Sequence, residues 1–536
     1  MKWKLYQSLI FVCLSVLPLT FLGQSKDKPK NNWHHLDLKT DGIFGISTEK
    51  AYQLLKNRTA KPVIVAVIDG GIDIEHEDLK EVIWVNEKEI PGNGKDDDAN
   101  GYTDDVHGWS FIGSKKGNVQ YDNTEMVRLI RKLKPTYETA LNTTPFSPEE
   151  RKEFELYQRL ISDYMAQLEQ AKAGFYSISL FKKTLQEIVD KMGNSSPKLA
   201  DFEDYKPEND LENRALKAIK SSLKEEPDFG KLKEEIDETL KHYDTQLKYH
   251  LNLDYDPRAI VGDRYEDSSE RSYGSPDVEG PDAEHGTHVA GIIAAIRNNR
   301  KGLDGVANQV KIMALRVVPD GDERDKDVAN AIRYAVDNGA KIINMSFGKA
   351  YVWNKAVVDS AVQYAQAKDV LLVHAAGNDA KNTDITKNYP NRFYSDSTGL
   401  NMGMAQSWIE VGASGWENNE ELAADFSNYG KKSVHVFAPG VQIYSSIPDS
   451  KYKQINGTSM AAPVVSGLAA MLRSYFPQLS AIAVKDLIVQ SVQKVEQKVK
   501  VRGEQGNTRL IFSELCSSGG IINAQKAVEM ALKTTK

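Results

Sequence analysis

The chain has 536 residues, and 68 Lys and Arg against 75 Asp and Glu give it a net charge of −7 at pH 7. This length predicts more than one domain, and the mean hydropathy of −0.48 excludes a polytopic membrane protein. The mildly acidic balance argues against nucleic acid as a partner, because basic patches dominate binding to phosphate backbones. The chain has two cysteines, Cys13 and Cys516, which exclude a disulfide framework and a Cys-based zinc site.

The N-terminus has the pattern of a secretory signal peptide. Lys2 and Lys4 precede an apolar run, Leu9–Gly23, and a polar, lysine-rich stretch follows it. The run is short for a membrane span. We therefore expect a signal peptide over residues 1–23, export to the periplasm or the medium, and no membrane span in the mature chain. An uncleaved membrane anchor is the alternative.

Continuous runs rich in β-branched residues indicate buried strands. The runs are Val63–Ile68, Val310–Val318, Lys341–Phe347, Val370–Ala375, Ile409–Ala413 and Val434–Ala438. Helical patterns such as Asp327–Asn338 and Val357–Ala367 separate them. This alternation predicts an α/β fold with a doubly wound, mainly parallel sheet and helices on both faces. Ligands of such sheets bind at the carboxyl ends of the strands, so the residues after each run are candidates for a site.

One block of 130 residues, 121–250, breaks the alternation and contains three glycines. Apolar residues recur there every three or four positions, as in amphipathic helices. We predict an all-helical insertion of three or four long helices over 121–252. A solvated coiled-coil spacer is the alternative. The predicted domain order is a segment at 24–60, the first part of the sheet domain at 61–120, the insertion, and the second part at 253–536.

Three polar residues stand at the ends of apolar runs or at helix starts. Asp69 ends the first predicted strand, His285 opens a helix in the segment HGTHVAG, and Ser459 opens a buried helix in NGTSMAAP. We expect Pro463 in the first turn of that last helix, where a missing N–H has no cost. Taken alone, each segment has an ordinary structural interpretation as a turn or a helix cap.

The chain order Asp, His, Ser is the one that subtilisin uses. The segments VIDGGID, HGTHVAG and NGTSMAAP resemble the signatures of the subtilisin-like serine endopeptidases, or subtilases. Two further segments occur in family order, NMSFG at 344–348 and AAGN at 375–378. The resemblance covers roughly Pro62–Gln120 and Asp254–Ala531. It implies a subtilisin-like sheet domain with the helical insertion between the Asp and His segments.

The resemblance also implies a role for each residue. Ser459 would be the nucleophile and His285 its general base, while Asp69 would orient the imidazole. Asn378 would bind the oxyanion through its side-chain amide. The substrate would be a polypeptide whose backbone pairs with the strand edge at Ser346, Phe347 and Gly348. This chemistry requires no cofactor.

One departure from the family concerns Gly70. Relatives usually have Ser or Thr at this position, and that hydroxyl supports the region around the aspartate. Its absence leaves the triad in place but changes the surroundings of Asp69.

An acidic loop raises the question of bound calcium. The candidate ligands are Asp96, Asp98, Asn100 and Asp104, at positions 1, 3, 5 and 9 of a pattern like an EF-hand. Position 12 is His107 rather than Glu. The resemblance adds Asp78, which matches a calcium ligand of many relatives. A bound calcium ion and an acidic turn without an ion both stay open.

Two other functions also stay open. The chain could be an inactive or weakly active subtilase whose helical insertion binds a partner, or a serine hydrolase that does not act on peptides. The insertion departs and returns between Asp69 and His285. We therefore also hypothesise that its helices narrow access to flexible or unfolded chains.

Overall fold

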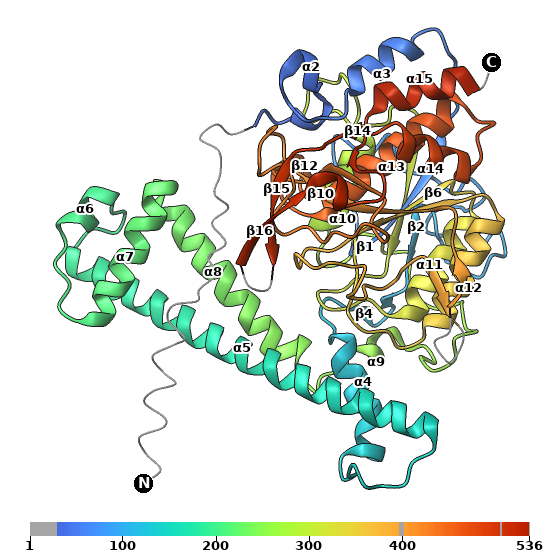
Figure 1. The fold of residues 1–536 in the computed structure, drawn as a ribbon. Helices are drawn as coiled ribbons and strands as arrows, with labels where there is room; N and C mark the ends of the chain where they lie inside the picture. The colour runs from blue at the N-terminus through green and yellow to red at the C-terminus, as the bar shows by residue number, and fades with distance from the viewer. Residues whose placement is uncertain (1–28, 396–400, 504–505, 535–536) are drawn as a thin grey trace. The chain divides into compact units, whose positions relative to one another are not determined.

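A computed structural model describes residues 29–395, 401–503 and 506–534 (Figure 1). The predicted signal peptide lies outside these residues. The chain divides into two compact units. The helical unit consists, in the described part of the chain, of Met126–Tyr255, and the sheet unit consists of Asp27–Glu125 with Asp256–Lys536. No helix in the described ranges combines the length and the apolar character that crossing a bilayer requires.

A nine-stranded sheet forms the centre of the sheet unit. In spatial order its strands are β14 (Gln493–Lys494), β17 (Gly520–Ile521), β11 (Val436–Pro439), β10 (Trp408–Ser414), β7 (Leu371–Ala375), β6 (Ile342–Met345), β1 (Val63–Asp69), β5 (Val310–Arg316) and β2 (Gly108–Ser110). All neighbours pair in parallel except β14 and β17. This confirms the predicted mainly parallel sheet, and each predicted run overlaps one of its strands.

Helices cover both faces of this sheet (Figure 1). Alternate residues of β1 point to opposite faces, so Val65 and Val67 enter one core while Ala66 and Ile68 enter the other. The first core includes α10 (Glu284–Ala294) and α13 (Thr458–Tyr475). The second includes α11 (Asp325–Asp337) and α12 (Lys355–Ala367). Burial on both faces explains why the central strands are mainly apolar rather than alternating.

Shorter elements complete the sheet unit. Its other helices are η1 (Trp33–His35), α2 (Leu38–Asp41), α3 (Thr48–Leu55), α9 (Arg258–Val261), α14 (Ala481–Gln490), η3 (Phe512–Glu514) and α15 (Ala524–Thr534). Four two-stranded antiparallel sheets pair β3 (Gly113–Ser114) with β4 (Gly117–Asn118), β8 (Phe393–Ser395) with β9 (Asn401–Met404), β12 (Ile443–Ile447) with β13 (Lys451–Ile455), and β15 (Lys498–Gly503) with β16 (Gly506–Ile511).

The described residues of the helical unit form no strand. Its helices are α4 (Glu125–Tyr137, whose first residue belongs to the sheet unit), α5 (Pro148–Met192), α6 (Leu199–Asp204), α7 (Asp210–Glu225), α8 (Phe229–Thr245) and the π-helix η2 (Gln246–His250). Two stretches in which apolar residues recur at helical spacing, 156–168 and 181–192, lie on one helix, α5, of 45 residues. A capping box between Ser147 and Glu150 begins this helix, and Gly193 in a left-handed conformation ends it.

A glycine inside α5 marks a close helix crossing. A Cβ added at Gly174 would lie 2.3 Å from the ring of Tyr243 on α8. The close approach of α8 therefore explains why a glycine stands at this position despite its low helix propensity.

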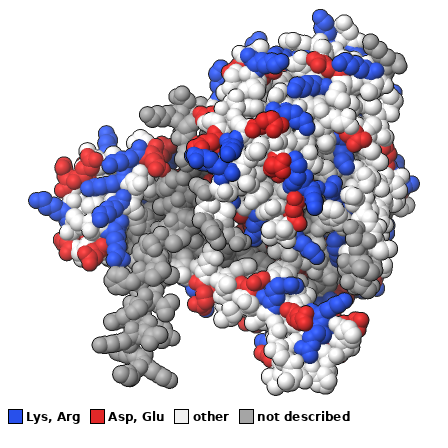
Figure 2. All heavy atoms as spheres, in the orientation of Figure 1, with Lys and Arg blue, Asp and Glu red and all other residues white. Residues whose placement is uncertain are grey.

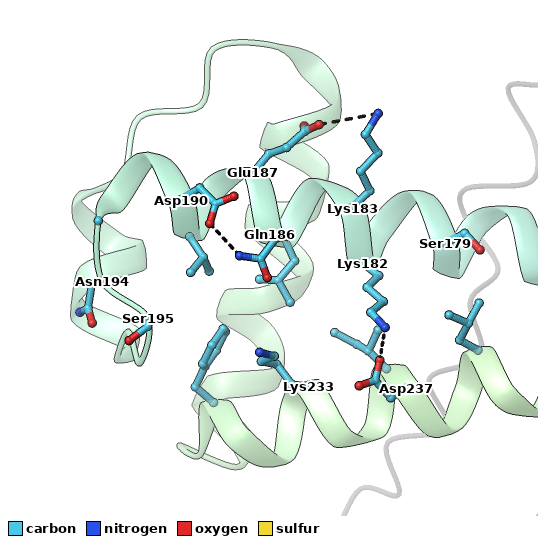
Figure 3. A pocket seen from close by; sticks show the side chains of 16 residues that line it. Ser179, Lys182, Lys183, Gln186, Glu187, Asp190, Asn194, Ser195, Lys233 and Asp237 are labelled. Atoms are coloured by element: carbon cyan, nitrogen blue, oxygen red, sulfur yellow. Dashed lines mark hydrogen bonds and ion pairs between the residues drawn. The ribbon is translucent and has the colours of Figure 1, made fainter.

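The helical unit has its own hydrophobic core. Ile188, Ile219 and Ile236, from α5, α7 and α8, belong to one buried cluster made only of residues of this unit. Beside it a hollow of about 830 Å³ opens between α5 and α8 (Figure 3). Charged groups around this hollow pair with each other, as in the 2.6 Å contact between Lys182 and Asp237. None of the predicted catalytic residues lines this hollow.

Candidate active site

Asp69 and His285 form a hydrogen-bonded pair. Asp69 is the last residue of β1, and His285 is the second residue of α10. The ring Nδ1 of His285 donates to Asp69 Oδ1 at 2.8 Å. The carboxylate is buried, whereas 44% of the imidazole side chain is exposed. A bond through Nδ1 leaves the second ring nitrogen, Nε2, available for chemistry.

Glycine at two positions permits this close approach of helix and strand. A Cβ at Gly286 would lie 2.1 Å from the carbonyl oxygen of Gly71 and 3.1 Å from Cβ of Asp69. A Cβ at Gly71, where φ is +150°, would lie 1.9 Å from the carbonyl oxygen of Glu279. Any larger residue would push α10 away from β1 and separate the imidazole from the carboxylate.

The charge of Asp69 changes the basicity of the imidazole. Burial opposes protonation of His285, but the Asp69 carboxylate outweighs it, through its charge and its hydrogen bond. Asp282 and Glu284 add to this attraction. As a result, the pKa of His285 is raised above the usual 6.5. The pair therefore makes a stronger base than a free histidine.

The second oxygen of Asp69 has a different environment. Oδ1 also accepts from the N–H of Gly70 at 2.8 Å, but Oδ2 is buried and has no hydrogen-bond partner among the described residues. Arg316, which the sequence analysis passed over, supports the same turn by donating from Nε to the carbonyl oxygen of Gly70 at 2.8 Å. It is the last residue of β5, and burial lowers the pKa of Arg316 to about 10.

Ser459 lies in the first turn of α13, which packs against α10 and β6. Backbone N–H groups of a first turn have no partners inside the helix, and the helix dipole makes this end positive. The hydroxyl of Ser459 donates to the carbonyl oxygen of Ser346 at 3.1 Å. An oxyanion formed on a group attached to Ser459 would therefore lie beside the backbone N–H of Ser459 and in the positive potential of the helix start.

Asn378 follows β7 and is tied to the start of α13. Its Oδ1 accepts from the N–H and from the hydroxyl of Thr458, both at 2.9 Å. These two bonds fix the carboxamide, so that its NH₂ group is directed away from Thr458. The N–H of Gly377 in turn donates to Thr458 Oγ1 at 3.1 Å. Thr458, which the sequence analysis did not single out, thus orients the proposed oxyanion donor.

The predicted substrate edge directly follows β6. Ser346 is buried, Phe347 half-buried and Gly348 exposed. A Cβ at Gly348 would lie 2.8 Å from Oδ1 of Asn388, and Nδ2 of Asn388 donates to the carbonyl oxygen of Ala376 at 3.2 Å. Asn388 therefore links the substrate edge to the segment that carries Asn378. No pattern in the sequence indicated this residue.

The acidic loop gathers only part of the predicted calcium ligands. Asp96 and Asp98 converge with Glu89, which the sequence analysis missed, and one ligand atom from each lies within 4.8 Å of the others. Asn100 accepts from the N–H of Tyr102, and Asp104 accepts from the N–H groups of Asn93 and Gly94. The three converging carboxylates likewise accept from backbone N–H groups of the loop. The three converging carboxylates are oxygen donors of the kind that calcium prefers.

Asp78 lies among hydrogen-bond donors. Its carboxylate accepts from the side-chain amide of Asn299, from the N–H of Leu303 and from the hydroxyl of Tyr452. These donors satisfy the charge without a cation. The surroundings of Asp78 therefore fit a structural carboxylate better than a metal ligand.

Pro463 is not in the first turn of α13, contrary to the sequence-based expectation. The helix begins at Thr458, which makes Pro463 its sixth residue. Its missing N–H therefore leaves the carbonyl group of Ser459, four residues earlier, without its normal helical donor.

Comparisons with known proteins agree with this architecture. The family model described as "Subtilase family" matches residues 60–508. A thermophilic serine proteinase of Bacillus sp. (strain AK1) is 38% identical over 212 residues, which are 39% of this chain and 47% of that protein. Thermitase of Thermoactinomyces vulgaris is 42% identical over 35% of this chain and 61% of its own length. Subtilisin DY of Bacillus licheniformis is 37% identical over 38% of this chain and 68% of its own length. The chain thus spans about half to two thirds of these relatives. The match over most of its length shows that the chain belongs to the subtilase family.

Proposed function

We propose that the sheet unit is a serine endopeptidase that uses Asp69, His285 and Ser459 as its catalytic triad. The observation that carries this proposal is the 2.8 Å bond between His285 and a buried carboxylate. Such a bond fixes one tautomer of the imidazole and raises its basicity. The named relatives include a serine proteinase, thermitase and a subtilisin, which supports the same chemistry.

The proposed reaction begins with proton transfer. Because Nδ1 of His285 is bonded to Asp69, Nε2 takes the proton from the Ser459 hydroxyl as Oγ attacks the scissile carbonyl carbon. The oxyanion is bound by the NH₂ group of Asn378 and the N–H of Ser459. His285 then protonates the leaving amine, which leaves an acyl-enzyme. Water activated by the same imidazole hydrolyses the ester and restores Ser459.

We propose polypeptides as substrates. The backbone of Ser346–Gly348 would pair with an extended substrate chain, as in recognition by strand addition. The exposed Gly348 leaves room for such a chain to approach. We further propose export of the enzyme, on the basis of the N-terminal sequence pattern alone.

Calcium binding is a separate proposal. Glu89, Asp96 and Asp98 would hold the ion, and its charge would relieve repulsion among the three carboxylates. The ion would stabilise the loop and take no part in peptide hydrolysis.

A fluorophosphonate probe tests the activity, since it labels an activated serine and leaves a capping serine unlabelled. We expect labelling of the wild type and none of Ser459→Ala. Ser480 is a matched control, because its hydroxyl caps the start of α14 and accepts from the N–H of Ala483. Ser480→Ala should label normally. A folded wild type that neither labels nor cleaves casein would favour the inactive relative instead.

A further inference from the structure

A chain of buried polar groups runs behind Ser459. The hydroxyl of Ser466 donates to Oδ1 of Asn344 at 2.8 Å, and Nδ2 of Asn344 donates to Oγ of Ser346 at 2.9 Å. The hydroxyl of Ser346 then donates to the carbonyl oxygen of Ser459 at 3.0 Å. Ser466 and Asn344 are fully buried and Ser346 is 4% exposed. All three bonds run in one direction and end on the nucleophile's own peptide group.

The two elements present these groups in register. Ser459 and Ser466 are seven residues apart on α13, close to two full turns, so both face β6. Asn344 lies in β6 and Ser346 directly follows this strand, so the two side chains, two residues apart, point to the same side. Hydrogen bonding on both sides fixes the backbone of Asn344, because β6 pairs with β1 and β7. The polar chain therefore joins the helix to a rigid central strand.

Pro463 explains why the carbonyl group of Ser459 needs this series of hydrogen bonds. Without an N–H at residue 463, the carbonyl oxygen of Ser459 needs another donor, and the hydroxyl of Ser346 provides it. This bond fixes the peptide plane that follows Ser459. The position of the Ser459 side chain relative to the substrate edge depends on that plane.

We propose that Asn344 and Ser466 are positioning residues for the nucleophile. They hold the hydroxyl of Ser346 in the orientation that replaces the missing N–H of Pro463, and so keep Ser459 aligned with the substrate edge. This inference rests on the proposed peptidase activity. It assigns both residues a role in the reaction rate, although neither touches the substrate.

The same helix, α13, contains a residue that serves as a matched control. Ser474 is also a buried serine of α13, but its hydroxyl has no hydrogen-bond partner in the described part of the protein. Ser466→Ala and Ser474→Ala each remove one buried hydroxyl from α13. Only the first removes a link of the polar chain.

The experiment measures kcat, KM and the rate of fluorophosphonate labelling for wild type, Ser466→Ala, Ser474→Ala, Asn344→Leu and the double variant Ser466→Ala/Asn344→Leu. We expect Ser466→Ala to lower kcat and the labelling rate roughly tenfold with KM nearly unchanged, because misplacement of a nucleophile acts on the chemical step. Ser474→Ala should keep wild-type kinetics. Ser466→Thr, which retains the hydroxyl, should recover most of the rate.

The double variant separates a connected chain from two independent effects. If the groups act as one chain, the double variant should be no slower than Asn344→Leu alone. Equal kcat for Ser466→Ala and Ser474→Ala, with a difference only in melting temperature, would overturn the positioning role. That comparison decides the question even if Asn344→Leu does not fold. A wild type without labelling would instead overturn the proposed activity, and the inference with it.

Discussion

The carboxamide of Asn378 is held by two hydrogen bonds from one residue, Thr458, which precedes the proposed nucleophile. The oxyanion donor and the nucleophile therefore share one anchor at the start of α13. A change at either residue should affect the transition state more than substrate binding.

Asn378→Ala should lower kcat by roughly two to three orders of magnitude with little change in KM, because it removes a donor to the developing oxyanion. Thr458→Val keeps the backbone N–H but removes the hydroxyl, and should give a smaller loss of the same kind. Steady-state kinetics on a peptide substrate measure both. An increase in KM without a decrease in kcat would show that Asn378 has another role.

The pH dependence of activity should reflect the raised pKa of His285. The base must be neutral to accept a proton, so kcat/KM should fall as the pH decreases through a value above 6.5. Asp69→Asn removes the carboxylate that raises this pKa, and should move the acid limb to lower pH while reducing kcat roughly 10⁴-fold. Circular dichroism at each pH separates titration from unfolding. An unmoved acid limb in Asp69→Asn would contradict this assignment.

Stability should fall in acid because of buried neutral histidines. Burial lowers the pKa of both His35 and His288 to about 3, against 6.5 for the unperturbed group. Between these values the unfolded chain binds protons that the folded protein does not, so the free energy of unfolding decreases as the pH falls. Each residue contributes up to about 1.4 kcal/mol per pH unit. Urea titrations from pH 7 to pH 4 measure the slope.

A substitution at one of these histidines tests whether it causes the dependence of the unfolding free energy on pH. His288 has its Nε2 atom 3.1 Å from the carbonyl oxygen of Lys453, a contact that an asparagine amide could partly replace. His288→Asn should reduce the slope by up to about 1.4 kcal/mol per pH unit, which corresponds to one bound proton. An unchanged slope would assign the acid sensitivity to other groups.

Chelation tests the acidic loop. If Glu89, Asp96 and Asp98 bind calcium, excess chelator should lower the melting temperature and added calcium should restore it. Asp96→Asn should weaken this response. An identical melting curve with and without chelator would show that the loop's own N–H groups are sufficient to hold it.

The helical unit should be removable. Its core is separate, and both chain ends that it connects bind the same side chain, since Arg324 pairs with Asp122 at 2.7 Å and with Asp256 at 3.2 Å. A short Gly/Ser bridge in place of Met126–Tyr255 should therefore give a folded protein that still labels with fluorophosphonate. An insoluble or unreactive product would show that the sheet unit depends on the insertion.

The same deletion tests whether the insertion restricts access. If it does, the shortened enzyme should cleave folded proteins faster relative to small peptides. An unchanged ratio would contradict that hypothesis.

The sequence predicted the strands well because a strand that is buried on both faces is a nearly continuous run of apolar residues. Val63–Asp69 is apolar up to the aspartate that ends it, and the sheet is buried there on both sides. The spacing of apolar residues at 156–168 and 181–192 of α5 also predicted helix correctly. The union of these two stretches in one helix was not predicted, because Gly174, a residue of low helix propensity, lies between them.

Contacts between distant polar residues were beyond the sequence. Glu89 meets Asp96 only after the loop folds, and Ser466 bonds to Asn344 across 122 positions. The sequence around a serine or an asparagine in an apolar element does not indicate which residue will be its hydrogen-bond partner. Only the spacing of Ser459 and Ser466 on one helix face could have suggested a link.

The N-terminal part of the sheet unit limits where the chain can be trimmed. Trp33 is fully buried and donates from its indole N–H to the carbonyl oxygen of Val441 at 3.2 Å. Further along, α3 packs against α15, so early and late parts of the unit share a core. Proteolytic maturation that removed Trp33 would open a cavity of indole size beneath the sheet's first face. An N-terminal truncation that leaves this core intact must therefore end before Trp33.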